Sequence, residues 1–298
     1  MSQSTFGRKF TVTTWGESHG KALGAVVDGV PAGLFLTEAD IQAYLDRRKP
    51  GQSRYTTARS EGDEVEILSG VFEGQTTGTP ISMIVRNKDQ RSRDYGNISQ
   101  TYRPGHADFG FDSKYGFRDY RGGGRSSGRE TIGRVAAGAI AAKILKELGI
   151  TLQAYTSSIG PISCHSYHPE IIRENAFYMP DMVAAEKAAQ YLEQCMKEED
   201  SAGGVIECRI NGVPAGIGDP VFGKLDAAFA QSLMSIGAVK AVEIGDGVKV
   251  STMKGSENND GFHMENGKIA KNSNHSGGIL GGISDGGEIF LRAHIKPT

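Results

Sequence analysis

The chain has 298 residues, of which 38% are hydrophobic and 23% charged, a composition typical of globular proteins and not of disordered tails. No apolar run approaches the roughly 18 residues that a membrane helix needs, and the N-terminus lacks the apolar stretch of a secretory signal. The formal net charge of -2 gives no general attraction to nucleic acid. Three widely spaced cysteines fit reduced thiols better than a disulfide framework or a zinc site. We therefore expect a cytoplasmic protein with no membrane segment and no bound metal.

The first ninety residues predict several strands and one helix. Thr37 fits the N-cap of a helix, and the pair Pro50-Gly51 is a natural stop for it. Runs rich in β-branched residues and bounded by turn residues predict strands. These strands are expected at residues 9–14, 22–28, 64–72 and 80–86.

The remainder of the chain starts with a long polar stretch, residues 87–128, which is rich in glycine and arginine and predicts a loop. Loops of this length inside a compact domain are usually functional or disordered. Apolar residues then recur at helical spacing over residues 129–148. Single helices alternate with pairs of strands, without regular βαβα order, so we predict an α+β layered fold and one domain over residues 1–298. Further helices are expected at 181–198 and 223–236, and further strands at 203–211, 239–251 and 287–295.

Arginine is concentrated in one part of the chain. Residues 47–134 hold 13 arginines and 3 lysines, whereas the rest of the chain holds 4 arginines and 13 lysines. A solvated surface of mixed charge is the plain interpretation, since the same stretch also holds 11 acidic residues. Guanidinium groups, however, bind carboxylate and phosphate in a planar, two-pronged way. The bias favours a site for a small molecule with several negative charges.

Two segments present a histidine between turn residues. In W-G-E-S-H-G-K, residues 15–21, the glycine spacing and the missing Ser or Thr exclude a nucleotide phosphate loop, and His19 remains. Imidazole exchanges protons near neutral pH, although the local sequence alone favours a turn histidine without a role. In R-P-G-H-A-D, residues 103–108, Pro and Gly fix the backbone before His106. Asp108 either orients this ring or caps the turn.

Three further segments suit anions or a flat ring. R-R-K-P-G-Q-S-R-Y-T-T-A-R, residues 47–59, is equally compatible with carboxylate binding and with a solvated basic turn. D-Y-R-G-G-G-R-S-S-G-R-E-T, residues 119–131, leads into the strongest helix, whose N-terminus favours an anion. An RGG-like RNA segment and a plain N-cap at Ser127 are the alternatives there. S-N-H-S-G-G-I-L-G-G-I-S-D-G-G, residues 273–287, is either a surface for a ring system or a glycine-rich turn.

Taken together and in this order, the segments closely resemble chorismate synthases. The resemblance begins with FGRKFTVTTWGESHG and runs through RRKPGQSRYTTAR, EILSGVFEGQTTGTPI, YRPGHAD and KYGFRDYRGGGRSSGRET to IGAVKAVEIGDG and SNHSGGILGGIS. It spans nearly the whole chain. It implies a lyase that uses reduced FMN, with NADPH as the candidate reductant, to remove phosphate and a proton from 5-enolpyruvylshikimate-3-phosphate.

The resemblance also implies roles for particular residues. His19 and His106 match the two catalytic histidines of the family, which protonate the leaving phosphate and the reduced flavin respectively. Arg48 and Arg54 match an anion site for substrate or NADPH, to which we add Arg129 and Arg134 because of their charge. The residues expected to contact FMN are Arg125, Ser126, Ser127, Gly237, Ala238, Gly281, Lys296, Pro297 and Thr298.

In the same way the resemblance implies a β-α-β sandwich, with helices packed between antiparallel sheets, that assembles as a homotetramer. Family members continue past the Lys-Pro-Thr segment, so we expect this chain to lack the family's C-terminal segment with its arginine and aspartate. That expectation keeps two alternatives open. One is an inactive FMN- or phosphate-binding remnant of the family, and the other is an RNA-binding module that uses residues 118–134.

Overall fold

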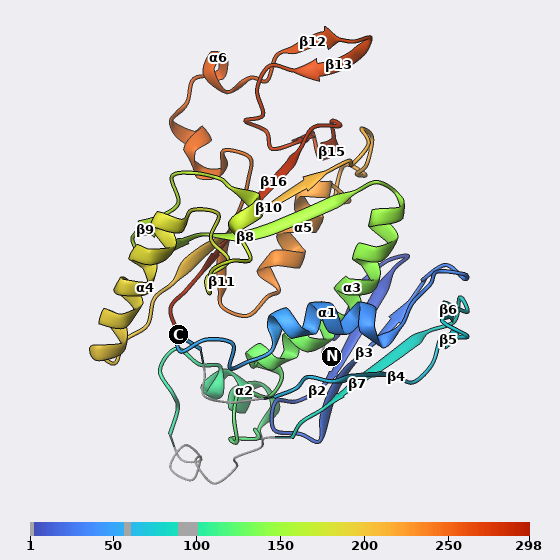
Figure 1. The fold of residues 1–298 in the computed structure, drawn as a ribbon, viewed down its shortest axis with the longest axis vertical. Helices are drawn as coiled ribbons and strands as arrows, with labels where there is room; N and C mark the ends of the chain where they lie inside the picture. Colours follow the sequence, from blue (N-terminus) through green and yellow to red (C-terminus); the bar gives the residue numbers. More distant parts are fainter. Residues whose placement is uncertain (1–2, 57–60, 89–100) are drawn as a thin grey trace. The chain divides into compact units, whose positions relative to one another are not determined.

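The computed structural model describes residues 3–56, 61–88 and 101–298, which divide into two compact units, Met1–Ile144 and Leu145–Thr298. Each unit is built on a five-stranded sheet whose neighbouring strands are all antiparallel. Helices pack against both sheets, which confirms the predicted α+β class (Figure 1). The expectation of one domain stays a prediction.

The sheet of the first unit has the strand order β1-β2-β3-β7-β4. The strands predicted at 22–28 and 80–86 are confirmed as β3 and β7, and the first predicted strand lies two residues later than expected, as β2. The bounds are β1 (Thr5–Gly7), β2 (Thr11–Gly16), β3 (Ala22–Asp28), β7 (Ile81–Arg86) and β4 (Val65–Ile67).

One face of this sheet forms the core of the unit. Leu23 of β3 pairs with Val85 of β7, and Val27 with Ile81, so alternate residues of both strands point to the same side. Helices α1 (Glu38–Arg48) and α3 (Thr131–Glu147) cover that side (Figure 1). Both helices were predicted. Their buried residues in this core are Ile41, Leu45, Ile132, Ala136, Ala137, Ala139 and Ile140.

Helix α1 begins where the sequence predicts. The backbone N–H and the hydroxyl of Thr37 both donate to the carboxylate of Asp40, at 2.9 and 3.0 Å. Lys143 of α3 donates to the same carboxylate at 2.6 Å. This bond is the main cause that lowers the pKa of Asp40, so an ion pair between the two helices accompanies the apolar packing.

Three predicted segments differ from the structure. The strand predicted at 64–72 is interrupted after Ile67 by a turn that ends at Gly70, where φ is +81°. The strand predicted at 239–251 ends at Ile244 and gives way to a 3₁₀ helix, Gly247–Thr252. The loop predicted at 87–128 contains helix α2 (Asp108–Tyr115), and its residues 89–100 lie outside the described part of the chain.

The sheet of the second unit has the order β11-β16-β10-β8-β9, and its apolar face packs on α5 (Leu225–Met234). Ile289 and Leu291 of β16 are buried there with Ile210 of the central strand β10. Strand β8 was not predicted. Hydroxyl and small residues lie on both of its faces, so the sequence lacks the alternation of apolar and polar residues that indicates a strand. The remaining bounds are β11 (Val239–Ile244), β16 (Ile289–Ile295), β10 (Gly204–Asn211), β8 (Thr151–Ile159), β9 (Ile162–Ser163) and α4 (Met182–Lys197).

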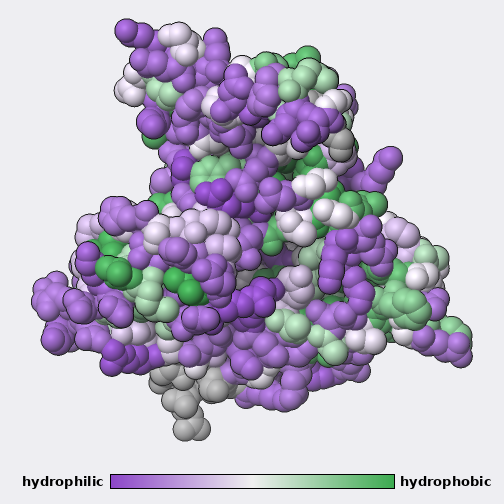
Figure 2. All heavy atoms as spheres, turned by 45° about the horizontal axis from the view of Figure 1, so that its top comes forward, coloured by the Kyte–Doolittle hydropathy of each residue, from purple (hydrophilic) through white to green (hydrophobic). Residues whose placement is uncertain are grey.

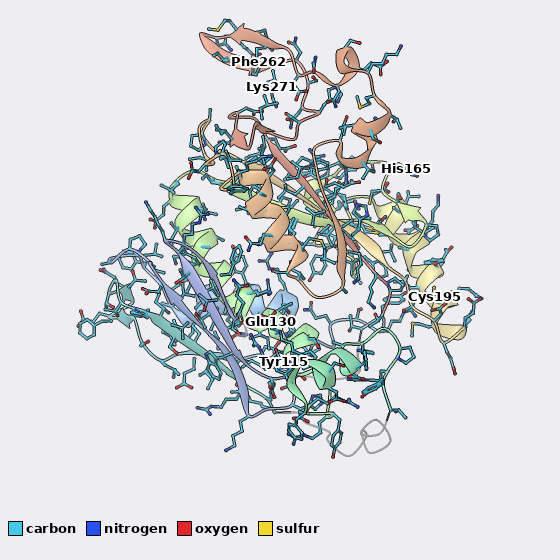
Figure 3. All side chains as sticks on the ribbon, turned by 180° about the vertical axis from the view of Figure 1, so that it is seen from behind. Tyr115, Glu130, His165, Cys195, Phe262 and Lys271 are labelled. Carbon is cyan, nitrogen blue, oxygen red and sulfur yellow. The ribbon has the colours of Figure 1, made fainter. Side chains whose placement is uncertain are left out.

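A cation with a largely buried side chain anchors the glycine-rich end of this unit. Lys271, marked in Figure 3 on β13, donates to Asp285 at 2.6 Å and lies 3.6 Å from Asp260. The carboxylate of Asp260 also accepts bonds from Ser273, His275 and Ser276. The short elements around this centre and elsewhere are β12 (Phe262–Glu265), β13 (Lys268–Lys271), β14 (Ile279–Leu280), β15 (Ile283–Ser284), α6 (Gly255–Asn258), β5 (Val71–Phe72) and β6 (Gln75–Thr76).

Polar and apolar side chains alternate over the face of the molecule displayed in Figure 2. In the described part of the chain, no helix has both the length and the apolar character needed to cross a bilayer.

Two glycines of α3 provide a test of the packing. A Cβ on Gly133 would lie 2.9 Å from Cγ2 of Thr14 and 3.0 Å from the carbonyl oxygen of Gly24, whereas a Cβ on Gly138 meets no atom within 4 Å. We expect Gly133→Ala to lower the free energy of unfolding by about 1–3 kcal/mol, because helix and sheet must separate. The control Gly138→Ala should leave it unchanged or raise it by up to about 1 kcal/mol. Denaturant unfolding measures both, and equal effects would contradict the packing.

Candidate active site

The His19 ring is seated between its own loop and the triple-glycine segment. The hydroxyl of Ser18, a buried residue, lies 3.0 Å from Nδ1 of His19. When that hydroxyl accepts from Nδ1–H, the ring can hold a proton on both nitrogens, and this imidazolium can deliver its Nε2 proton to a bound group. His19 and Gly122 are 103 residues apart in the sequence, so the fold itself builds this part of the site.

Gly122 makes this seat available. A Cβ placed on Gly122 would lie 2.3 Å from Nδ1 and 2.4 Å from Cε1 of His19, and φ of Gly122 is +139°. Both observations require glycine at this position. The first glycine of G-G-G is therefore explained by contact with a histidine ring, a contact that the sequence analysis of residues 119–131 did not predict.

The second histidine lies on a turn that reaches the same glycine. The backbone N–H of His106 donates to the carbonyl of Arg103 at 3.2 Å, and the guanidinium of Arg103 donates to the carbonyl of Gly122 at 3.1 Å. His106 itself is exposed. The structure thus links the segments of His19 and His106 through the backbone of Gly122.

Asp108 closes the turn and does not orient His106. Its carboxylate accepts bonds from the backbone N–H, Nε and Nη2 of Arg103, and Arg118 adds a longer ion pair at 3.6 Å. The hydrogen bond from the Arg103 side chain is the first cause that holds the pKa of Asp108 well below its usual range. Of the two interpretations that the sequence left open, turn capping is the one that the structure bears out.

A buried carboxylate joins two of the arginines predicted to bind anions. Asp63 is 2% exposed, and its Oδ2 lies 2.5 Å from Nη1 of Arg48, while its Oδ1 lies 3.1 Å from Nη1 of Arg129. Nη2 of Arg48 makes no hydrogen bond to another described residue. One negative charge therefore fixes two cations and leaves the pair with an excess positive charge, which suits an anionic ligand.

The other two predicted anion-binding arginines have separate partners. Arg134 donates to Glu130 at 2.8 Å, one helical turn earlier, and Glu130 is marked in Figure 3. Arg54 donates to the hydroxyl of its neighbour Tyr55 at 2.7 Å. Arg59 of the same basic segment lies outside the described residues.

Arg125 lines an open cavity at the end of β2. It donates to the carbonyl groups of Gly16 and Thr14, at 3.1 and 3.0 Å, and to the hydroxyl of Thr14 at 2.7 Å. The hydroxyl of Ser126 donates to the carbonyl of Gly123. Ser127 accepts from the N–H of Arg129 and caps the 3₁₀ turn before α3, as one sequence interpretation held. The cavity has a volume of about 590 Å³ and is lined by Ser4, Thr13, Thr14, Trp15, Gly16, Glu17, Gly20, Lys21, Ala22 and Arg125.

The remaining predicted FMN contacts lie in the second unit. The backbone N–H of Lys296 donates to the carbonyl of Ala238 at 3.0 Å, so the Gly237–Ala238 and Lys296–Thr298 segments are neighbours. Gly281 does not join them. It forms the tip of the β14–β15 hairpin, where the carbonyl of Gly282 accepts from the N–H of Leu225 at the start of α5, and Gly237 follows the other end of that helix.

Sequence reasoning missed Asp63 and Asn87. Asp63 follows a glycine in a polar segment and has a positive φ of +46°, and Asn87 comes directly after the buried strand β7. A polar residue immediately after a buried strand was the one available signal, because such positions often hold functional side chains.

Comparison of the whole chain with known protein families identifies the family to which it belongs. The family model described as chorismate synthase matches residues 10–298. The chain belongs to the chorismate synthase family. A chorismate synthase of Lachnoclostridium phytofermentans is 64% identical over 301 residues, and one of Agathobacter rectalis is 62% identical over 300. Both alignments cover 100% of this chain and 82% of the relative.

A solved structure supports the same conclusion for the fold. A crystal structure of a chorismate synthase aligns with a TM-score of 0.83 and 33% identity over 97% of this chain and 85% of the solved one. The family named by the sequence resemblance is therefore confirmed, and neither the RNA-binding module nor the inactive remnant gains support. The roles of individual residues stay predictions.

The contact between His19 and Gly122 yields a prediction for this family site. We expect Gly122→Ala to lower kcat roughly 10- to 100-fold, because the added methyl group must displace the ring that is proposed to transfer a proton. Gly110→Ala in α2, where a Cβ meets no atom within 4 Å, is the matched control and should keep full activity. Steady-state kinetics of the two variants decide the point, and full activity of Gly122→Ala would show that the ring is free to move.

Asp108 yields a prediction for the pH dependence of stability. Its pKa is lowered on folding, so its ionised form stabilises the fold above its ordinary pKa of roughly 3.9, and that contribution disappears as the pH falls through the lower folded value. We expect Asp108→Asn to be less stable than the unaltered chain at pH 6, with a gap that narrows below about pH 4. Denaturant unfolding at a series of pH values measures this gap. A gap independent of pH would mean that the Arg103 contact contributes no electrostatic stability.

Proposed function

We propose that this chain eliminates phosphate and a proton from 5-enolpyruvylshikimate-3-phosphate to give chorismate, as a lyase with no net oxidation or reduction. The observation that carries the proposal is the placement of His19. Its ring lies against the triple-glycine segment, in the same unit as the pair Arg48 and Arg129, which share one carboxylate. A proton donor and a positively charged anion site are what loss of a phosphate leaving group requires.

Four arginines are proposed to bind the anionic groups of the substrate or of NADPH: Arg48, Arg54, Arg129 and Arg134. The substrate carries one phosphate and two carboxylates, and guanidinium groups bind both in a planar, bidentate way. The preformed pairing of Arg48 and Arg129 with Asp63 supports this role, because both cations are already held in place when the substrate arrives.

The two histidines are proposed to handle protons. His19 would donate a proton to the departing phosphate from its imidazolium form, in which Nδ1–H donates to the Ser18 hydroxyl, Nε2 holds the transferable proton, and the ring is left neutral. His106 would supply a proton at the cofactor. Its exposed position on a turn closed by Arg103 and Asp108 supports a side chain directed away from the core.

The residues present fit an FMN molecule in part. In the first unit, Arg125, Ser126 and Ser127 would hold it, and the cavity beside Arg125 has the size of a small-molecule site. In the second unit, the exposed backbone of Gly237 and Ala238 lies next to Lys296, which supports a shared role with Pro297 and Thr298. Gly281 lies near the start of α5, whereas Gly237 follows its other end, and its role is proposed from the family resemblance alone. When bound in its reduced form, FMN supplies electron density and a basic ring nitrogen for the elimination.

We further propose a cytoplasmic location and a homotetramer. The three cysteines, Cys164, Cys195 and Cys208, are free thiols in the structure, which supports a reducing compartment. The tetramer rests on the family resemblance alone, and sedimentation equilibrium tests it.

The decisive experiment is anaerobic turnover of 5-enolpyruvylshikimate-3-phosphate with FMN reduced by dithionite. We expect chorismate absorbance and phosphate release to appear together and in equal amounts. FMN binding without turnover would favour an inactive remnant, and absence of both would contradict the proposed function.

The same assay tests His106. We expect His106→Ala to lower kcat by about 100-fold or more while substrate binding changes less, because general acid catalysis contributes roughly this factor. His263→Ala, on the exposed β12–β13 hairpin, is the matched control and should keep full activity. An unchanged kcat in His106→Ala would remove this residue from the mechanism.

A further inference from the structure

Asn87 lies where β7 ends, and it clamps the loop that carries His19. Its Nδ2 donates to the carbonyl of Glu17 at 3.1 Å and to the carbonyl of Gly20 at 2.8 Å. Its backbone N–H donates to the carbonyl of Lys21 at 3.1 Å. One residue therefore holds both sides of the loop, directly before and directly after the Ser18–His19 pair.

The other end of the same amide binds Arg129. Its Oδ1 accepts from Nε of Arg129 at 3.1 Å and from Nη2 at 2.8 Å. A guanidinium can only donate and a carbonyl can only accept, so the chemistry of the partners fixes which atom of the amide is oxygen and which is nitrogen. Both hydrogens of the amide and its oxygen are used within the protein.

These contacts complete a continuous chain through the site. Arg48 binds Asp63, Asp63 binds Arg129, and Arg129 binds Asn87, whose amide holds the His19 loop. Arg129 is 5% exposed, and the side chain of Asp63 is fully buried. The chain is therefore shielded from water at its centre, where the contact between Asp63 and Arg129 is an ion pair that solvent screens little.

We propose that Asn87 is a positioning residue that fixes the His19 loop relative to the anion-binding arginines. It acts through His19 and Arg129 and touches no reacting atom itself, since its amide is fully used. The inference rests on the proposed roles of His19 and the arginines and adds the physical link between them. Without the amide, the turn from the N–H of Gly20 to the carbonyl of Glu17 and the bond from the backbone N–H of residue 87 to Lys21 are retained, and both bonds from the side chain to the loop are lost.

The testing variant is Asn87→Asp, which has the same shape. It keeps an oxygen towards Arg129 but places a second oxygen against two carbonyl groups, where it cannot donate. We expect kcat to fall roughly 10- to 100-fold with a substrate KM that changes less than about threefold, because a small misplacement of a proton donor affects the chemical step. Asn87→Ala removes the same bonds without adding charge. If the aspartate variant does not fold, the same measurements are made on Asn87→Ala.

Asn175 offers a matched control. Its Nδ2 also donates to two carbonyl groups, those of Ile171 and Met179, and its Oδ1 accepts two N–H groups, in a loop of the second unit with no proposed site residue. Asn175→Asp makes the same chemical change and should lower stability while leaving kcat unchanged. Equal loss of kcat in the two variants would show a general effect of the substitution and overturn the proposal.

Two measurements separate positioning from a structural role. Combined with His19→Ala, the Asn87 variant should cause no further loss of kcat, because residues that act as one unit are not additive. Hydrogen–deuterium exchange of unliganded protein should rise in residues 16–21 for Asn87→Asp and not for Asn175→Asp.

Each outcome decides one claim. Additive losses, or unchanged exchange in residues 16–21, would overturn the role of Asn87 while His19 keeps its own. Full activity of His19→Ala would instead remove the proposed acid and the role of Asn87 with it.

Discussion

The burial of the Asp63 carboxylate between two guanidinium groups is the interaction on which the site depends. A buried charge without a partner is strongly unfavourable, so Asp63 requires Arg48 and Arg129 to stay where they are. These arginines come from the end of α1 and from the turn before α3, the two helices that cover the first sheet. The apolar packing of the two helices and the ion pairs of Asp63 therefore favour the same positions of α1 and α3. A shift of either helix would disturb both.

The backbone of Gly122, as well as side chains, positions the groups of the site. Gly122 gives the His19 ring a flat surface to rest on, and its carbonyl accepts a bond from Arg103. The glycine-rich segment thus works as a structural support at its first glycine. The role proposed for this segment in cofactor binding falls to the residues that follow, where Arg125 is anchored on the end of β2 beside an open cavity.

The sequence could predict elements that carry local signals, and it could not predict those made by distant contacts. Helix α1 has its Thr37 start signal, and β3 and β7 are runs with β-branched residues bounded by turn residues, so these were found. Helix α2 was missed, because its charged first and middle turns are held by Arg103 and Arg118 from outside the helix. His19 gave a weak local signal and was identified through the family resemblance. Asp63 and Asn87 were missed, since nothing in their neighbours reveals that they meet Arg129.

The order of strands in the two sheets has a consequence for synthesis of the chain on the ribosome. The first sheet is complete once Arg86 has been made, and its strands pair mostly with near neighbours in the sequence. In the second sheet β16 lies between β11 and β10, although both of these strands are made before it. They can therefore pair with β16 only after residues 289–295 have been made. Pairing over such separations is slow. Until then the edges of β10 and β11 that face β16 have no partner, and unpaired strand edges are prone to pair with other chains.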